Sequence, residues 1–287
     1  MNIRTPVPRG SSVVSGDNSL VESMRRAAAR NELFSLPVRR RNHGEWIEAL
    51  SLFQWDDRRL EDLVVANGRD RWGTDNRHLA GSSFIVAYLT RLTFPLISQY
   101  VLEKRVPNIS LSNLAFHWDG QRIDSTALNE PSFAALPNDP ASGHPDALVV
   151  PDEAALYAQL KEWLFDANFN LVIPSLRRAA LASLKVSWNA VASSCAQVFH
   201  WLYYLDEEPE TVVMAAEAFF RDPSSPAYRQ VTMEVIEHQG NRGYFARRAG
   251  CCLWWRGGGS KNYCSGCILL SREQQDAQFR EMLDERR

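Results

Sequence analysis

The chain has 287 residues, of which 45% are hydrophobic and 23% are charged, a balance typical of a folded globular protein with a substantial core. Its formal net charge of −2 excludes a chain-wide attraction to nucleic acid or to anionic membranes, so any basic site must be local. The N-terminus has no apolar run like that of a secretion signal, and we expect residues 1–18 to form a flexible arm of a cytoplasmic protein.

Apolar residues recur at helical intervals in the segments that follow. The periodicity predicts helices at about residues 19–36 and 45–65. A longer apolar stretch covers residues 82–104 and contains Arg91, Pro95 and Gln99, which would be costly in a lipid bilayer. We therefore predict a buried helix, kinked at Pro95, rather than a membrane span.

Residues 109–123 have a different pattern. Short alternating runs stand on both sides of the pair Asp119-Gly120, which predicts two strands joined by a tight turn. Residues 131–151 are rich in Pro, Asn, Asp and Gly and predict a loop. We place a boundary there, between an N-terminal lobe of residues 19–150 and a C-terminal lobe of residues 151–287.

The C-terminal lobe is expected to be helical. Helices are predicted at residues 153–168, 172–186, 187–205, 209–220 and 227–238. Glycines at 240, 243 and 250 predict irregular structure after them, and the charged tail from residue 271 to 287 predicts an amphipathic helix. The predicted fold class is mostly α (α+β): a helical two-lobed protein with a small β-hairpin and a C-terminal loop that holds a cysteine-ligated cluster.

Four of the five cysteines fall in the short segment 251–267, and they are Cys251, Cys252, Cys264 and Cys267. A disulfide framework would scatter its pairs along a secreted chain. Clustering in a chain without a secretion signal indicates a metal or redox site instead. The fifth, Cys195, stands in an apolar helical context and is predicted to be a buried core residue.

The spacing of the four thiols favours one kind of centre. Cys264-x-x-Cys267 is a chelating loop that serves zinc and iron–sulfur clusters alike. The side chains of Cys251 and Cys252 diverge in extended backbone, so they suit a wide inorganic core better than one small zinc ion. The pattern therefore favours a [2Fe–2S] cluster, while a zinc site and a thiol redox pair remain as alternatives.

Basic residues surround the four cysteines in the sequence, namely Arg247, Arg248, Arg256 and Lys261. Such cations would favour the reduced form of an anionic cluster, or would attract an anionic substrate. They would equally fit a solvated basic loop. The sequence has no dinucleotide-binding motif after a strand, so a separate electron donor is expected.

The cysteine segment also resembles a known family. Arg247-Arg248-x-x-Cys251-Cys252, followed by Tyr263-Cys264-x-x-Cys267, resembles the C-terminal motif of the FhuF-type siderophore ferric-iron reductases. In that family the four cysteines bind a [2Fe–2S] cluster. Residues 185–192 and 90–96 resemble two further segments of the family, and the second is shared with siderophore synthetases.

This resemblance implies an iron–sulfur oxidoreductase of iron homeostasis. It would transfer one electron to a cytoplasmic ferric siderophore, plausibly a hydroxamate, so that Fe(II) is released. Its partners would be that siderophore and an electron donor, with no nucleic acid and at most a peripheral association with a membrane. The alternatives are a zinc-binding structural or interaction module and a cluster-based redox sensor.

The sequence departs from the family pattern at two places. The spacer between the cysteine pairs has eleven residues, Leu253 to Tyr263, one more than is usual in the family. The triglycine Gly257–Gly259 is the obvious position for the additional residue, because a flexible loop absorbs it without moving the ligands. Residues 109–113 contain no histidine, which argues against a synthetase.

Overall fold

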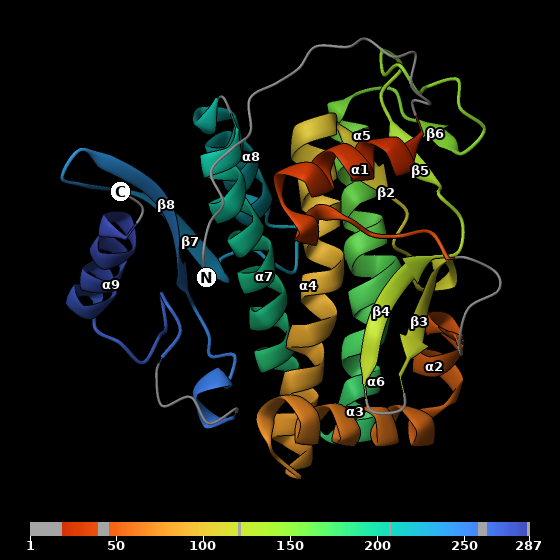
Figure 1. Cartoon of the computed structure of the whole chain (residues 1–287), viewed down its shortest axis with the longest axis horizontal. Helices are drawn as coiled ribbons and strands as arrows, with labels where there is room; N and C mark the ends of the chain where they lie inside the picture. The colour runs from red at the N-terminus through yellow and green to blue at the C-terminus, as the bar shows by residue number, and fades with distance from the viewer. Residues whose placement is uncertain (1–18, 40–45, 120–121, 207, 258–262, 286–287) are drawn as a thin grey trace.

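Helices form the centre of the molecule and small sheets lie at its sides (Figure 1), which confirms the mostly α (α+β) fold class. The computed structural model describes residues 19–39, 46–119, 122–206, 208–257 and 263–285. The arm predicted at residues 1–18 therefore lies outside the described residues. The α-helices are α1 Leu20–Arg30, α2 Ala49–Trp55, α3 Asp57–Trp72, α4 Arg77–Glu103, α5 Glu153–Lys161, α6 Asn170–Ala180, α7 Leu184–Leu205, α8 Pro209–Arg221 and α9 Arg272–Asp284.

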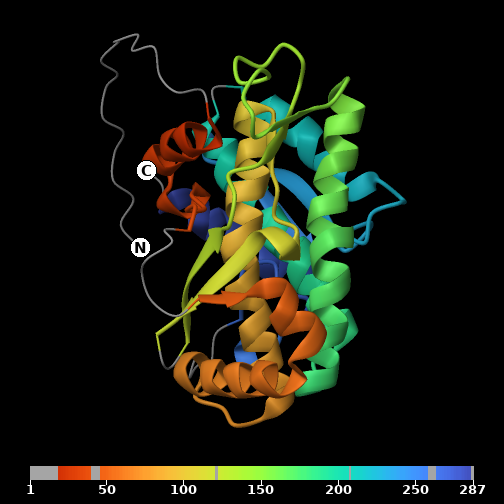
Figure 2. The ribbon, with the colours of Figure 1, turned by 90° about the vertical axis from the view of Figure 1, so that its right-hand side faces the viewer.

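Helix α4 is the central element. It packs against α3 and α7, and α3 lies across one of its ends (Figure 2). It continues through Pro95 and begins at Arg77, because the side chain of Asn76 accepts a hydrogen bond from the Leu79 amide and caps it. In the described part of the chain it is the one helix apolar enough to cross a membrane, yet 83% of its most apolar window is buried. We therefore assign α4 as a core helix.

The other helices of the two halves agree largely with the predictions. The segment predicted at 45–65 is divided into a short strand, Trp46–Glu48, and helices α2 and α3. Helix α5 continues into a π-helical segment, Glu162–Phe169. The break predicted between residues 186 and 187 lies instead at Leu181, which adopts a left-handed conformation after α6, and Ser183 caps α7.

Three small sheets accompany the helices in the described part of the chain. The strands are β1 Trp46–Glu48, β2 Arg105–Pro107, β3 Leu114–Trp118, β4 Ile123–Leu128, β5 Phe133–Ala135, β6 Ala147–Val149, β7 Val231–His238 and β8 Asn241–Arg248. The predicted hairpin is confirmed by the antiparallel pair β3–β4, which β1 extends to three strands. The segment 131–151, predicted to be a loop, contributes β5 and β6, which form a sheet with β2.

The helix predicted at residues 227–238 is wrong. Residues from Val231 to His238 form strand β7, which pairs with β8 in an antiparallel hairpin, so the irregular region predicted after Gly240 is also wrong. Gln239 and Gly240 both adopt positive φ, at 49° and 83°, as the two central residues of a tight hairpin turn require. Four of the eight residues of β7, namely Val231, Thr232, Val235 and Ile236, are β-branched, and such residues favour a strand over a helix.

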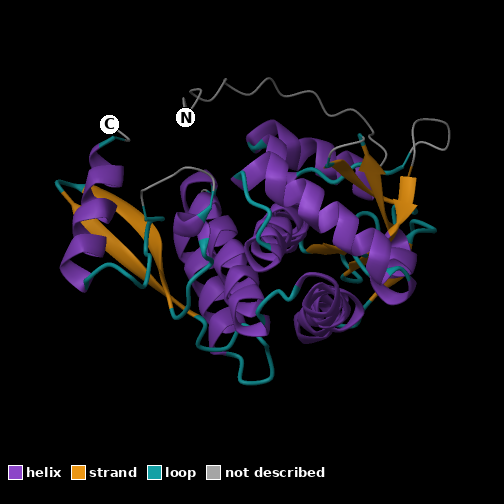
Figure 3. Cartoon of the chain, turned by 90° about the horizontal axis from the view of Figure 1, so that it is seen from below, coloured by secondary structure: helices purple, strands orange, loops and turns teal. Residues whose placement is uncertain are grey.

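The hydrophobic core is continuous between the two halves of the chain. One buried cluster extends from Leu20 in α1 to Tyr244 in β8, and α4 and α7 pack together within it. The β7–β8 hairpin packs on α7, and α9 covers the hairpin (Figure 3). A smaller buried cluster of Phe245, Phe279 and Leu283 joins α9 to β8. The C-terminal hairpin and helix are thus fixed to the side of the helical core.

A partly buried carboxylate connects α5 to the end of α8. Asp222 accepts hydrogen bonds from Lys161 at 2.8 Å, from the Tyr157 hydroxyl at 3.2 Å and from the Ser224 amide at 2.9 Å. Burial acts to raise the pKa of Asp222, but the hydrogen bonds from Lys161 and Ser224 outweigh it and hold the pKa well below its usual range. The ionised carboxylate therefore stabilises the folded chain.

Replacing Asp222 by asparagine should lower the free energy of unfolding by about 1–3 kcal/mol at pH 7. A carboxyl whose pKa is lowered by folding contributes its full stability above the unfolded pKa of about 4, and loses it as the pH falls further. The cost of the substitution should therefore be smaller at pH 3 than at pH 7 in urea unfolding. The exposed pair Arg69–Asp75 provides the control, since Asp75→Asn should cost less than about 1 kcal/mol. An Asp222→Asn cost that did not change with pH would contradict this assignment.

Candidate functional site

The cysteine segment lies between two elements that pack on each other. Strand β8 ends at Arg248, just before Cys251, and α9 begins shortly after Cys267. The rings of Phe245 and Phe279 stack at a centroid distance of 4.6 Å between these elements. The side-chain amide of Gln275, in the first turn of α9, donates a hydrogen bond to the carbonyl of Cys267 at 3.0 Å. Both ends of the segment are therefore held in place.

Two buried glycines let the segment approach the core. A Cβ atom at Gly250 would overlap the side-chain amide of Asn189 in α7. Gly266 has φ of 66°, and a Cβ atom there would overlap the carbonyl oxygen of Ala246 in β8. The chain therefore enters the cysteine segment directly beside α7 and returns directly beside β8.

Arg248 lies between two of the cysteines. Its Nη1 atom is 3.5 Å from the Sγ atom of Cys252 and 3.3 Å from the Sγ atom of Cys264. The Nε atom of the same side chain is buried and has no hydrogen-bond partner among the described residues. Arg248 thus presents positive charge to the two thiols through its Nη1 atom, an arrangement that stabilises sulfur in its anionic form.

The two thiols near Arg248 titrate as a coupled pair. A hydrogen bond from Cys264 lowers the pKa of Cys252 against the effect of burial, and the charge of Arg248 lowers it further. The same hydrogen bond, together with burial, raises the pKa of Cys264. The pair therefore loses one proton readily, and the resulting thiolate is held beside the guanidinium group.

The other two cysteines flank this pair without joining it in the described geometry. The Sγ atom of Cys251 accepts a hydrogen bond from the Leu253 amide at 3.3 Å. Cys267 is buried, and its amide donates to the Cys264 carbonyl at 3.1 Å in a tight turn. Among the residues that the structure describes, no three His, Cys, Asp or Glu side chains gather as the ligands of one ion. The structure therefore brings together Cys252 and Cys264, with Cys251 directly before the first and Cys267 three positions after the second.

The basic residues predicted near the site differ in their surroundings. Arg247 donates to Glu234 in β7 at 2.9 Å and pairs with Asp276 in α9, so two carboxylates balance its charge. Arg256 is exposed and lies over the Trp255 ring at 5.7 Å. Lys261, also predicted here, lies outside the described residues. Arg248 is the described member of this set that contacts the cysteine thiols.

A cavity of ≈ 280 Å³ opens beside the Cys252–Cys264 pair. Arg248 and Trp254 form part of its wall with the two cysteines, and residues of helices α4 and α7 form the rest of the wall. That helical part of the wall carries small and polar residues among apolar ones, and its members are Val86, Leu89, Thr90, Ala190, Ser193, Ser194 and Gln197. The thiol pair therefore faces a partly polar cavity that a substrate could enter.

The hydroxyl and amide groups of this wall are not among the site residues predicted from the sequence. Thr90 comes from α4, whereas Ser193, Ser194 and Gln197 come from α7, about a hundred positions later in the chain. Polar residues on an otherwise apolar helix are the one signal that could have indicated them. The Ser194 hydroxyl is already joined to that of Thr93 at 2.7 Å, which fixes the two helices together at this level.

A search against protein-family models and a search of curated proteins found no match to this chain. The resemblance in the cysteine motif therefore stays a prediction. The donor set itself fits a thiolate-ligated cluster, because four thiols stand in one segment and the guanidinium group of Arg248, whose buried Nε atom has no acceptor among the described residues, contacts two of them.

Proposed function

We propose that this chain is a cytoplasmic [2Fe–2S] protein that reduces ferric siderophores, as the FhuF-type motif implies. The observation that carries the proposal is Arg248, which contacts the thiols of Cys252 and Cys264 on the wall of a cavity. Cys251, Cys252, Cys264 and Cys267 would hold the cluster. When bound, the cluster supplies the single electron that converts Fe(III) to Fe(II).

The chain's own residues would neutralise the charge of the thiolates and would bind the substrate. The guanidinium of Arg248 counters the negative charge of the thiolates, which favours the form that carries an added electron. The hydroxyl groups of Thr90 and Ser193 and the amide of Gln197 line the cavity and can donate hydrogen bonds to the oxygen atoms of a chelate. The cavity is small, so one edge of the chelate would face the thiol side of the site.

The release of iron follows from the chemistry of the substrate. Hydroxamate and similar oxygen atoms are hard ligands that hold Fe(III) much more tightly than the larger and less charged Fe(II). Adding one electron therefore loosens the complex. No proton-transferring group is needed for this step, and the electron has to come from a separate donor.

The coupled thiols favour one second candidate function. Because Cys252 is readily deprotonated next to Cys264, the pair is also suited to react with oxidants, as in a redox sensor. A sensor would respond to peroxide and would be indifferent to a ferric chelate. A structural zinc module, the remaining alternative, would undergo neither reaction.

Anaerobically purified protein should be red-brown, with about two iron atoms per chain, and dithionite should bleach its visible absorption. Mixing the reduced protein with ferrioxamine B should restore the colour and release Fe(II), which a ferrous chelator traps and quantifies. The gallium(III) complex of the same siderophore is the control, because it matches the shape and charge but accepts no electron. A colourless protein with one bound zinc would sink the proposal, and reoxidation by peroxide alone would favour the sensor.

A further inference from the structure

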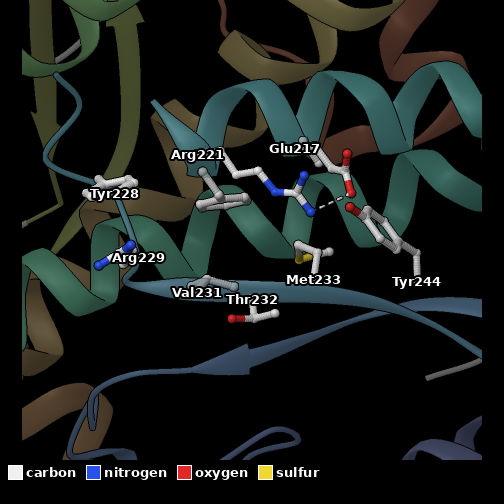
Figure 4. A pocket seen from close by; sticks show the side chains of 10 residues that line it. Glu217, Arg221, Tyr228, Arg229, Val231, Thr232, Met233 and Tyr244 are labelled. Atoms are coloured by element: carbon white, nitrogen blue, oxygen red, sulfur yellow. Dashed lines mark hydrogen bonds and ion pairs between the residues drawn. The ribbon is translucent and has the colours of Figure 1, made fainter. Parts of the chain in front are cut away.

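A second cavity lies between helix α8 and the β7–β8 hairpin and contains none of the four cysteines. Its volume is ≈ 650 Å³, within the range of cavities that bind small molecules. Figure 4 shows Glu217 and Tyr244 at one end and Tyr228 with Arg229 at the other, and residues of β7 line the space between them. The cavity is therefore elongated and differs chemically at its two ends.

The wall between the two ends is largely apolar. It is formed by Ala216 and Phe220 of α8 and by Val231 and Met233 of β7, and Thr232 adds one hydroxyl group to it. The charged residues of the lining are two guanidinium groups, Arg221 and Arg229, and one carboxylate, Glu217. Because Glu217 pairs with Arg221 at 3.1 Å, the lining keeps one positive charge in excess, and it belongs to Arg229.

Arg229 is available for a ligand. Among the described residues it makes no ion pair, and its guanidinium group lies over the ring of Tyr228 at 4.9 Å. Its backbone adopts φ of 57°, an uncommon conformation for a residue with a side chain. The amide of Arg229 donates to the carbonyl of Phe220 at 3.3 Å, which fixes this strained residue at the cavity's end.

The opposite end has a buried donor that the fold does not use. Tyr244 is 1% exposed, and its hydroxyl group has no hydrogen-bond partner among the described residues. Burial, and then the nearby charge of Glu217, raises the pKa of Tyr244, so the hydroxyl stays protonated. An unpaired buried hydroxyl costs free energy unless a ligand supplies an acceptor.

We propose that this cavity binds a small amphipathic monoanion with a hydrogen-bond acceptor at its far end. A carboxylate would pair with Arg229, an apolar body would pack along Phe220, Val231 and Met233, and the acceptor would meet the hydroxyl of Tyr244. The single excess positive charge of the lining matches a monoanion rather than a dianion or a cation. This site does not depend on the proposed reductase function.

Calorimetric titration of the full chain with three probes of equal chain length tests the proposal. Octanoate should bind one molecule per chain, 8-hydroxyoctanoate should bind about three- to tenfold more tightly, and octylamine should not bind. Arg229→Asn, which tolerates the left-handed backbone, should weaken both acids about tenfold. Arg25→Gln, which removes a guanidinium group from α1 outside the cavity, should leave both affinities unchanged.

Tyr244→Phe gives the sharper result, since it removes only the hydroxyl group. It should leave the affinity for octanoate nearly unchanged and abolish the advantage of 8-hydroxyoctanoate. Failure of both acids to bind would overturn the proposal, as would equal binding of octylamine. An Arg229→Asn variant that behaved like Arg25→Gln would overturn the role of Arg229, and a retained hydroxyl advantage in Tyr244→Phe would overturn the role of Tyr244.

Discussion

Replacing Cys264 by serine should abolish the visible absorption of the purified protein and its reduction of ferrioxamine B together. Cys264 contacts Arg248 and forms the coupled pair with Cys252, so it lies at the centre of the proposed ligand set. A serine hydroxyl is a hard and weakly acidic ligand, and it replaces a thiolate poorly at an iron–sulfur cluster. Iron and sulfide content, measured beside the spectrum, should fall together to background.

Cys195→Ser is the matched control. Cys195 is fully buried in α7, and burial raises the pKa of its thiol, so it behaves as a core residue. The variant should keep both the colour and the activity, at some cost in stability. Colour that survived Cys264→Ser, or that disappeared in Cys195→Ser, would show that the ligands have been assigned wrongly.

Adding one methyl group at Gly250 should also empty the site, although residue 250 is not a ligand. The new Cβ atom of Gly250→Ala would overlap the side chain of Asn189, which is held by a hydrogen bond from its Nδ2 atom to the Lys185 carbonyl at 2.7 Å. Overpacking of this kind costs about 1–3 kcal/mol and is relieved by movement of the backbone. Because Cys251 and Cys252 follow directly, we expect iron content to fall several-fold while far-ultraviolet circular dichroism stays unchanged.

A compensating change makes this prediction sharper. Removing the obstructing side chain with Asn189→Ala should restore iron binding in the Gly250→Ala background. The Oδ1 atom of Asn189 has no partner among the described residues, so this change breaks only the bond to Lys185. Gly143→Ala is the control, because no atom lies near its added Cβ. If the double variant stayed as empty as Gly250→Ala, steric overlap with Asn189 would not be the cause.

The sequence could predict the cysteine segment because its members are close along the chain. The sequence could not separate the roles of Arg247 and Arg248. The two differ because adjacent residues of a strand point to opposite faces, and this strand was not predicted. Arg247 faces Glu234 and α9, whereas Arg248 faces the thiols. That distinction depends on residues 241–248 forming a strand, whereas the glycines in and beside this segment predict irregular structure there.

The β7–β8 hairpin was not predicted because its sequence pattern is ambiguous. The residues from 231 to 238 mix apolar and charged side chains in a short segment whose period is ambiguous, so pairing with β8 decides the outcome. The polar wall of the cavity beside the thiols was not predicted because its residues lie on α4 and α7. These helices are far apart in the sequence and come together only when the core packs. The long helices, by contrast, were found because an apolar face is a local signal, although α4 begins at Arg77 rather than at the predicted residue 82.

The fixed ends of the cysteine segment determine which changes in sequence length this region can tolerate. Since β8 and α9 are already folded against each other, the connection between the two cysteine pairs starts and ends at set positions. The entropy cost of closing such a connection grows only slowly with its length. Insertions or deletions between Gly257, which packs on Trp72, and Tyr263 should therefore be nearly neutral, so the number of residues between the pairs is a poor guide to ancestry. Gly250, Gly257, Gly266 and the cysteines themselves are positions at which change should be rare.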